Sequence, residues 1–364
     1  MKILKICLVF FLLVGCQTNK TEKESGNHIK LNINPKNKES ILLSSFVDSI
    51  EFIHLNKAGN EIISNISKVQ LFNNNIFILD REGNAIFVFK KNGSFVKKIQ
   101  NTGRGPGEYL QLVDFDISSN GIFLLDYPNN ILHYDIDFEY IEKYNLRGLY
   151  TFSFKCYKDL FWTYNEEGSE NELFHFSAIN QEGDTKDRFI KKDFHGKEYQ
   201  WHIGSEFNIH DGNLYFSPLF DNRIYKTNGH EVEKAYTIDF GEYSFPNDQN
   251  IFKENIFSQS FNYAVKQNFW ITNKYLILDF LYDSERKFMV LDKKNQSIQY
   301  GLVDNDLFPD YRFLPSWNDR NTLIEVVDAF TINEFFPFLR NEVSCLESLS
   351  EDDNPVLILY HVKK

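Results

Sequence analysis

The chain has little cysteine and no hydrophobic run long enough to cross a membrane. Four cysteines among 364 residues are too few for a disulfide framework, so the fold must depend on a hydrophobic core. The apolar run at residues 6–14 is much shorter than the roughly 20 residues that a transmembrane helix needs. Basic residues are also in the minority, with 39 Lys and Arg against 51 Asp and Glu and a formal net charge of −12. This acidic balance argues against nucleic acids and anionic lipids as partners.

The first residues have the order of an export signal. Two lysines precede the apolar run, and Gly15 and Cys16 follow it. The stretch from Leu13 to Cys16 resembles the lipobox of bacterial lipoproteins, in which cleavage precedes a cysteine that is acylated on its sulfur. We therefore expect residues 1–15 to be a lipoprotein signal peptide and Cys16 to be lipidated, which anchors the protein to a membrane. An ordinary signal peptide with an incidental cysteine is the alternative.

A polar segment, residues 16–40, separates this signal from the rest of the chain. It is rich in Asn, Lys, Glu and Ser and poor in large apolar residues, which is typical of a flexible tether. Residues 41–364 are expected to form the folded body, and the 36 Phe and 19 Tyr of the chain supply ample apolar area. The two cysteines of this body, Cys156 and Cys345, can pair in an oxidising compartment.

A repeat with a shift of 46 residues is the main evidence for the fold. Aligned without gaps, residues 69–100 and 115–146 share the pattern I-F-[IL]-L-D-x-x-x-N, which begins at Ile76 and at Ile122. The pattern describes an apolar strand, an Asp turn and a second apolar segment. A period of 40–50 residues with several short strands in each unit is typical of a propeller blade.

Three weaker copies and one divided copy follow. The weaker copies begin near residues 159, 212 and 274 and show the same succession of strands and turns. The sixth unit is expected to combine both ends of the chain, because a shared blade closes the ring and removes two exposed sheet edges. Its expected inner, third and outer strands are residues 322–327, 355–362 and 49–55, with a short helix or loop inserted at 333–341.

The sequence therefore predicts an all-β protein, a six-bladed β-propeller with four-stranded antiparallel blades, whose last blade is closed by strands from both termini. A β-sandwich with accidental similarity at one offset is the alternative, although sandwiches have no such long period. The turn Gly103-Arg-Gly-Pro-Gly-Glu-Tyr109 and the strand after it resemble NHL-type propeller repeats.

More closely, the chain after its signal resembles the six-bladed β-propeller lipoproteins of Gram-negative bacteria. Those proteins share the lipobox, the glycine-rich turn and an ending like Asn354-Pro-Val-Leu-Ile358. The resemblance implies a lipid-anchored protein of the cell envelope that faces the periplasm or the cell surface. It implies little about activity, since a fold hosts many functions.

One face of the predicted propeller gathers the polar residues that we favour as a ligand site. In a four-stranded meander, the turn between the second and third strands lies on the same face as the connection to the next blade. Loops on such rims commonly carry function. The candidate ligand residues are Arg81, Arg104, Glu108, Tyr109, Tyr127, Arg223 and Arg286. The glycine-rich turn can offer backbone N–H groups to an anion, but a tight passage between blades is the simpler interpretation.

No catalytic residue, metal ligand or cofactor site can be named from the sequence. Asp80, Asp126 and Asp279 end equivalent strands, and turn capping suits such repetition better than a Ca²⁺ site. The closely spaced His195, His202 and His210, with Trp201 among them, match no zinc signature, while Trp162 and Trp270 lie in apolar strands and are expected in the core.

Our leading functional hypothesis is a non-catalytic binding or scaffolding module for a protein or a glycan. The rival hypothesis is a hydrolase or lyase acting on a carbohydrate or lactone, with polar residues around the axial channel. A sensor partner in envelope signalling is a third possibility.

Overall fold

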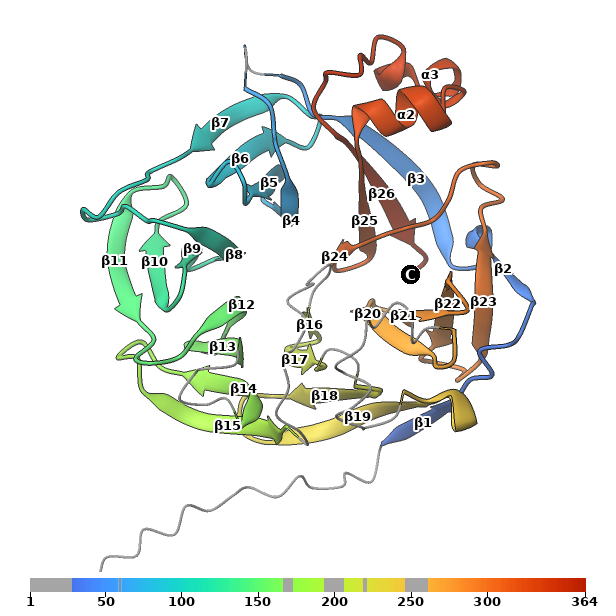
Figure 1. Ribbon diagram of the computed structural model, residues 1–364, viewed down its shortest axis with the longest axis horizontal. Coiled ribbons are helices and arrows are strands. Elements are labelled where there is room, and N and C mark those ends of the chain that lie inside the picture. Colours follow the sequence, from blue (N-terminus) through green and yellow to red (C-terminus); the bar gives the residue numbers. More distant parts are fainter. Residues whose placement is uncertain are drawn as a thin grey trace, which may run out of the picture.

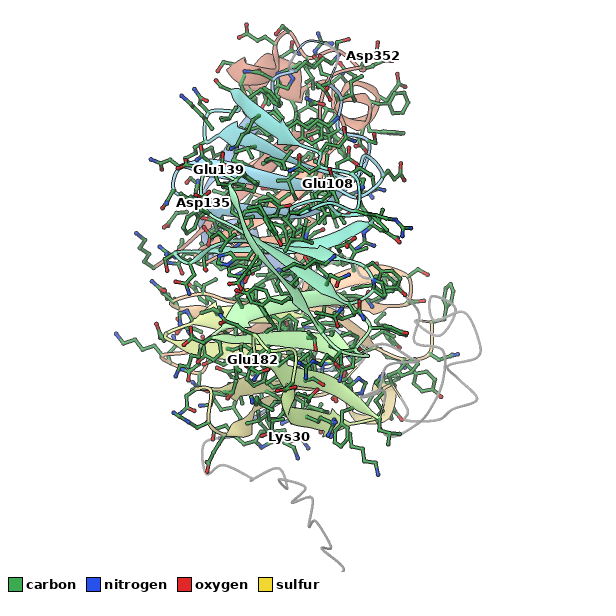
Figure 2. All side chains as sticks on the ribbon, turned by 90° about the vertical axis from the view of Figure 1, so that its left-hand side faces the viewer. Lys30, Glu108, Asp135, Glu139, Glu182 and Asp352 are labelled. Atoms are coloured by element: carbon green, nitrogen blue, oxygen red, sulfur yellow. The ribbon has the colours of Figure 1, made fainter. Side chains whose placement is uncertain are left out.

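The computed structural model describes residues 28–57, 59, 61–165, 173–192, 206–218, 221–245 and 261–364. In this part of the chain, six β-sheets surround a central axis like the blades of a wheel (Figure 1). Seen from the side, the wheel is a flat disc (Figure 2). The structure therefore confirms the six-bladed β-propeller and excludes the β-sandwich.

Five blades are continuous in sequence, and their strands follow chain order from the axis outward. The first blade contains β4 (Ile66–Phe72), β5 (Asn75–Asp80), β6 (Ala85–Lys90) and β7 (Phe95–Ile99). The second contains β8 (Leu112–Ser118), β9 (Gly121–Asp126), β10 (Asn130–Tyr134) and β11 (Tyr140–Asn145). The third contains β12 (Thr151–Tyr157), β13 (Leu160–Asn165), β14 (Phe174–Ile179) and β15 (Thr185–Lys191). The fourth contains β16 (Phe207–His210), β17 (Asn213–Phe216), β18 (Arg223–Thr227) and β19 (Val232–Asp239). The fifth contains β20 (Val265–Ile271), β21 (Tyr275–Tyr282), β22 (Glu285–Asp292) and β23 (Ile298–Asp304).

The sixth blade joins the two ends of the chain, as the sequence predicts. From the axis outward it contains β24 (Trp317–Asp319), β25 (Thr322–Val327), β26 (Val356–Val362) and β3 (Val47–His54). The pairing of β26 with β3 places Leu357 opposite Ile53. Main-chain hydrogen bonds therefore close the ring between two segments that lie about 300 residues apart in sequence. The expected inner strand, residues 322–327, is β25, the second strand of the blade, while the innermost place belongs to the three-residue β24, which was not predicted from the sequence. A strand of three residues is too short to show the alternation of apolar and polar residues by which a strand is predicted from sequence.

The insertion expected in this blade is helical. Between β25 and β26 the chain forms α2 (Ala329–Phe335) and α3 (Leu339–Glu342), followed by the 3₁₀ turn η4 (Ser344–Leu346). Both helices pack outside the sixth blade (Figure 1). No helix within the described residues has the length and hydrophobicity of a membrane span.

Two short strands that precede β3 in sequence also pair with the propeller. β1 (Ile29–Asn32) adds to the outer edge of the fourth blade by pairing in parallel with β19, and β2 (Ser40–Leu42) does the same with β23 of the fifth blade. Two further 3₁₀ turns are η1 (Leu43–Ser45) and η2 (Gly241–Tyr243). Part of the segment that we expected to be a tether therefore covers two blade edges, because its apolar residues alternate with polar ones and Leu31 is buried.

The hydrophobic cores lie between neighbouring blades. One of them joins Phe77 and Leu79 of β5 to Phe115 and Leu124 of the second blade. Each such side chain contributes about 1.5–3 kcal/mol on burial. The predicted core tryptophans are confirmed, since Trp162 and Trp270 are 2% and 0% exposed. The two cysteines of the body do not form a disulfide.

Candidate functional site: the Arg81 rim and the axial cavity

The candidate ligand residues come from two kinds of connection on one face, which we call the Arg81 rim. One group lies where the second strand of a blade leads into the third, in the turn or in the first two residues of the third strand, and the connection between β7 and β8 supplies the other. The first group is Arg81, Tyr127, Arg223 and Arg286, and the second is Arg104, Glu108 and Tyr109. The meander topology of the blades places all these connections on one side of the disc.

The glycine-rich turn is a self-contained structural element. The Glu108 carboxylate accepts a hydrogen bond from the Gly105 N–H at 2.7 Å, and a Cβ atom at Gly103 would lie 2.0 Å from that carboxylate. Tyr109 is fully buried and donates from its hydroxyl to the carbonyl of Ile99 at 3.2 Å. Burial raises the pKa of Tyr109 to about 12. Tyr109 is thus part of the packing between blades, while Arg104 is exposed to solvent.

Two of the rim arginines are held by ion pairs. Arg223 donates from Nε and Nη2 to the Asp221 carboxylate at 2.8 and 2.6 Å, a bidentate arrangement. Arg286 pairs with Asp279. The ring of Tyr127 stacks on Phe152, with centroids 4.8 Å apart. These contacts hold three of the rim side chains, Tyr127, Arg223 and Arg286.

Two of the three repeated aspartates, Asp80 and Asp126, cap turns as the sequence predicts. Asp80 accepts hydrogen bonds from the N–H groups of Ser64, Asn65 and Gly83 at 2.8, 3.1 and 2.8 Å. Asp126 accepts two equivalent bonds in the second blade. Each carboxylate ties the chain that enters a blade to the end of its second strand. A carboxylate whose oxygens already accept several backbone N–H groups has a structural role. Asp279 instead lies inside β21, where it accepts the Asn268 N–H at 2.6 Å and pairs with Arg286.

A cavity of about 220 Å³ lies on the axis beneath the Arg81 rim. The innermost strands β4, β8, β12, β16 and β24 line it together with neighbouring turn residues. Its aromatic walls include Phe152 and Trp317. The charged lining residues are Lys68, Arg81, Lys155, Arg320, Asp114, Glu206 and Asp319. Four cations therefore face three carboxylates inside a protein whose net charge is −12.

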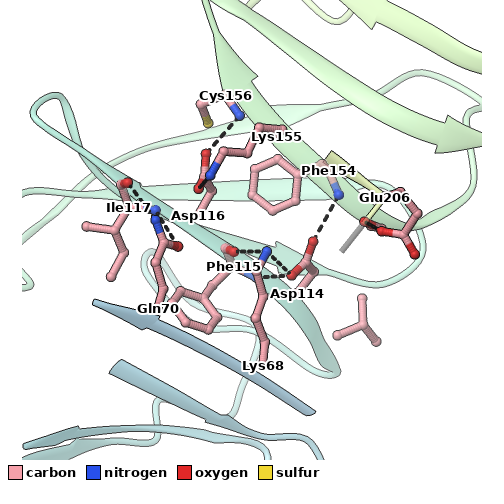
Figure 3. A network of polar contacts seen from close by, with 12 residues as sticks. Lys68, Gln70, Asp114, Phe115, Asp116, Ile117, Phe154, Lys155, Cys156 and Glu206 are labelled. Carbon is pink, nitrogen blue, oxygen red and sulfur yellow. Dashed lines mark hydrogen bonds and ion pairs between the residues drawn. The ribbon is translucent and has the colours of Figure 1, made fainter. Parts of the chain in front are cut away.

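Buried ion pairs join the first three blades at this cavity (Figure 3). Asp114 of β8 binds the Lys68 ammonium of β4 at 2.7 Å and accepts the Phe154 N–H of β12 at 2.9 Å. Asp116 of β8 binds the Lys155 ammonium of β12 at 2.5 Å. Both aspartates are at most 4% exposed. One strand of the second blade thus clamps its two neighbours at the axis.

The electrostatics follow from burial. Desolvation raises the pKa of Asp114 despite its bond to Lys68. Burial alone would lower the pKa of Lys155, but the adjacent Asp116 carboxylate outweighs it, and the pKa is raised. Burial also raises the pKa of the Cys156 thiol well above its usual range. Lys155 therefore stays charged in its pair, and the Cys156 thiol stays protonated at neutral pH.

Sequence reasoning missed these axial pairs. Lys68, Asp114, Asp116 and Lys155 stand inside strands that are otherwise apolar or uncharged, which is unusual unless the charge has a partner. These charged residues within uncharged strands were the sequence feature that could have indicated the buried ion pairs.

The histidine-rich stretch adds no site in the described chain. His195, Trp201 and His202 lie outside the described residues. His210 ends β16 and hydrogen-bonds Lys293 at 2.9 Å. Within the described ranges, no group of three His, Cys, Asp or Glu side chains is arranged to hold a metal ion, and the lining of the axial cavity contains neither His nor Cys.

Comparison with known proteins connects this geometry to a family. A family model described as a domain of unknown function, DUF4934, matches residues 27–361. The chain belongs to the DUF4934 family. No relative was found among curated proteins.

Solved structures share the fold of this DUF4934 chain. An exported protein of Bacteroides fragilis is 18% identical, with a TM-score of 0.73 over 93% of this chain and 100% of its own. A DUF4221 family member from Bacteroides vulgatus is 10% identical, with a TM-score of 0.52 over 87% and 97%. Virginiamycin B lyase from Staphylococcus aureus is 12% identical, with a TM-score of 0.41 over 86% and 99%. The last likeness is too weak to carry an argument about activity.

Proposed function

We propose that this protein is an exported, lipid-anchored binding module that holds a glycan or protein ligand over the Arg81 rim. The observation that carries the proposal is the state of the axial carboxylates. Asp114 and Asp116 are nearly buried and each is bound to a lysine and to backbone N–H groups. Groups saturated in this way form a rigid, preorganised wall and do not exchange protons with a substrate. A rigid wall beneath a charged rim suits binding.

Export and anchoring are part of the same proposal. The order of charge, apolar run and Gly15-Cys16 supports a lipoprotein signal, with Cys16 as the acylated residue. The Bacteroides fragilis protein with the same fold is described as exported. We place the module on a Gram-negative envelope membrane, facing the periplasm or the cell surface.

The experiment is a screen of the full-length protein, in detergent, against a glycan array and immobilised envelope proteins. The rim variant Arg81→Ser/Arg104→Ser is compared with Lys90→Ser/Lys294→Ser, which removes the same charge from exposed positions on the opposite face. We expect the rim variant to lose at least tenfold in affinity and the control to bind normally. Loss in the control alone contradicts the assignment of the rim. Turnover of a glycoside or lactone would favour the rival hydrolase or lyase instead.

A further inference from the structure

A groove in the sixth blade lies on the same side of the disc as the Arg81 rim. It has a volume of about 650 Å³. One wall comes from residues 310–314, in the connection between β23 and β24, and the other comes from the end of β25 and from α2. The same two kinds of connection form the Arg81 rim in other blades, so the meander topology places the groove on that side.

The groove has apolar walls that a ligand can reach. Phe335 of α2 is 69% exposed, and Leu314 of the other wall is 37% exposed. The ring of the buried Tyr311 meets the ring of Phe336 edge to face, with centroids 4.8 Å apart, which joins the two walls. A concave site of this size, with apolar walls and a few polar groups, is typical of small-molecule binding.

Exposed carboxylates outnumber cations in the groove. Asp310 and Asp328 line it and are exposed, and neither carboxylate has a hydrogen bond or ion pair with the residues that the structure describes. Asp328 precedes α2, yet its side chain caps no N–H group of the helix. Arg312, also exposed, is the only cation among the described lining residues, and it pairs with neither aspartate. Since Arg312 balances at most one of the two carboxylates, the groove has room for one positive charge.

Glu325 contributes a buried carboxyl group to the same groove. It is 4% exposed, and its oxygens accept hydrogen bonds from the Tyr311 and Tyr360 hydroxyls at 2.8 and 2.7 Å. Burial raises the pKa of Glu325, and in either protonation state this carboxyl adds no positive charge. The groove is thus the reverse of the axial cavity, in which four cations face three carboxylates. The negative faces of its aromatic rings add to the attraction for a cation.

We propose that this groove binds a small organic cation, a protonated amine carried on a flat apolar ring. In this arrangement the ring packs between Phe335 and Leu314, and the ammonium lies beside the Asp328 carboxylate. The inference goes beyond the proposed function, because the groove is formed by other residues than the Arg81 rim and selects its ligand by a different charge. A protein with a formal net charge of −12 also attracts cations from solution.

The test is calorimetric titration of the full-length protein, in a non-ionic detergent at pH 7, with three indole probes that differ in charge. They are tryptamine, the neutral tryptophol and the anionic indole-3-propionate. An exposed ion pair and a cation–aromatic contact together change an affinity roughly fivefold to tenfold, so we expect tryptamine to bind at least fivefold more tightly than tryptophol. Indole-3-propionate should bind most weakly. Salt should weaken the binding of tryptamine and leave that of tryptophol unchanged.

Two pairs of variants at α2 locate the binding. Phe335→Ser should weaken tryptamine binding about fivefold, whereas Phe330→Ser, which removes a 53% exposed ring outside the lining, should leave it unchanged. Asp328→Asn should abolish the preference for tryptamine over tryptophol. Glu334→Gln should keep that preference, because it changes an exposed carboxylate of the same helix outside the lining. All four side chains are exposed, so the variants should melt close to the parent temperature.

Each outcome decides the proposal. Equal binding of tryptamine and tryptophol, or unchanged binding in Phe335→Ser, overturns it. Tighter binding of indole-3-propionate overturns the charge preference and assigns the groove to anions at Arg312. Tighter binding of the peptide acetyl-Phe-Lys-amide than of tryptamine overturns the small-amine class and assigns the groove to a basic segment of a protein partner.

The rim variant separates this inference from the proposed function. Arg81→Ser/Arg104→Ser should bind tryptamine as the parent does, since neither residue lines the groove and each is exposed. Groove-dependent binding of tryptamine without any rim-dependent ligand refutes the proposed function and leaves this inference standing. Rim-dependent binding of a glycan or protein without binding of tryptamine does the opposite.

Discussion

Removing the carboxylate of Asp80 tests whether the repeated aspartates hold the blades together. Asp80 is 1% exposed and accepts three backbone N–H groups, from two residues that precede β4 and one in the turn after β5. Gly83 belongs to the same unit, since a Cβ atom there would lie 2.4 Å from the Asp80 carboxylate. Asp80→Ala leaves all three donors without this acceptor, whereas Asp80→Asn keeps one oxygen in place.

The magnitude follows from the number of donors and their access to water. A hydrogen bond to a charged group contributes roughly 1.5–3 kcal/mol, and an unsatisfied buried donor costs about 1–3 kcal/mol. Ser64 and Asn65 are exposed residues, so water can replace part of what their N–H groups lose. We therefore expect Asp80→Ala to lower the free energy of unfolding by about 3 kcal/mol and Asp80→Asn by about 1 kcal/mol.

The assay is urea unfolding followed by far-UV circular dichroism at pH 7, with and without Ca²⁺. Asp137→Ala is the control, because it removes an exposed carboxylate and should change stability by less than about 0.5 kcal/mol. A loss below about 0.5 kcal/mol in Asp80→Ala would refute the capping argument. Stabilisation of the parent by Ca²⁺ that disappears in Asp80→Ala would assign the carboxylate to a metal site instead.

Three further predictions concern closure, titration and anchoring. Deleting residues 356–364 removes β26, which pairs with both β25 and β3, so the variant should show no cooperative melt; a melt at the parent temperature contradicts this. Burial, together with nearby Lys192 and Arg223, lowers the pKa of His175 to about 3. The unfolded chain therefore binds a proton there below about pH 6.5 while the folded chain does not, and stability should fall between pH 6.5 and pH 3. His175→Phe should lose less stability than the parent between pH 7 and pH 5 in urea titrations, and an equal loss would exclude this group as the cause. Cys16→Ala should move the protein from the membrane fraction to the soluble fraction, whereas unchanged fractionation would show that another element anchors it.

The blades were predictable because their signal is repeated. Ile76 and Ile122 start equivalent second strands, and Asp80 and Asp126 end them, so each copy supports the interpretation of the other. Closure of the sixth blade followed from the physical need to pair two exposed edges. The position of the innermost strand did not follow, since β24 has three residues and no copy elsewhere in the sequence to support it.

The start of the folded body was harder to locate for a different reason. Residues 29–33 alternate apolar and polar side chains, with Leu31 and Ile33 buried at 2% and 3%, but the segment is set in a polar context. The strand with which it pairs in parallel, β19, lies about 200 residues away in sequence. Composition averaged over a segment hides a short edge strand whose partner is distant.

The axial site escaped prediction because its information lies in differences between repeats. The shift of 46 residues that aligns the first two blades places Lys68 on Asp114, and these two residues bind each other across the blades. The same shift places Gln70 on Asp116, which binds Lys155 of the third blade. Equivalent positions on the innermost strands of neighbouring blades lie close together at the axis, so identical charges there would repel each other. The residues at these positions must therefore differ from one blade to the next. A residue that recurs from blade to blade, such as the capping aspartate, therefore indicates a structural role. A charged residue that changes from blade to blade on an innermost strand, as Lys68, Asp114 and Lys155 do, instead marks the cavity.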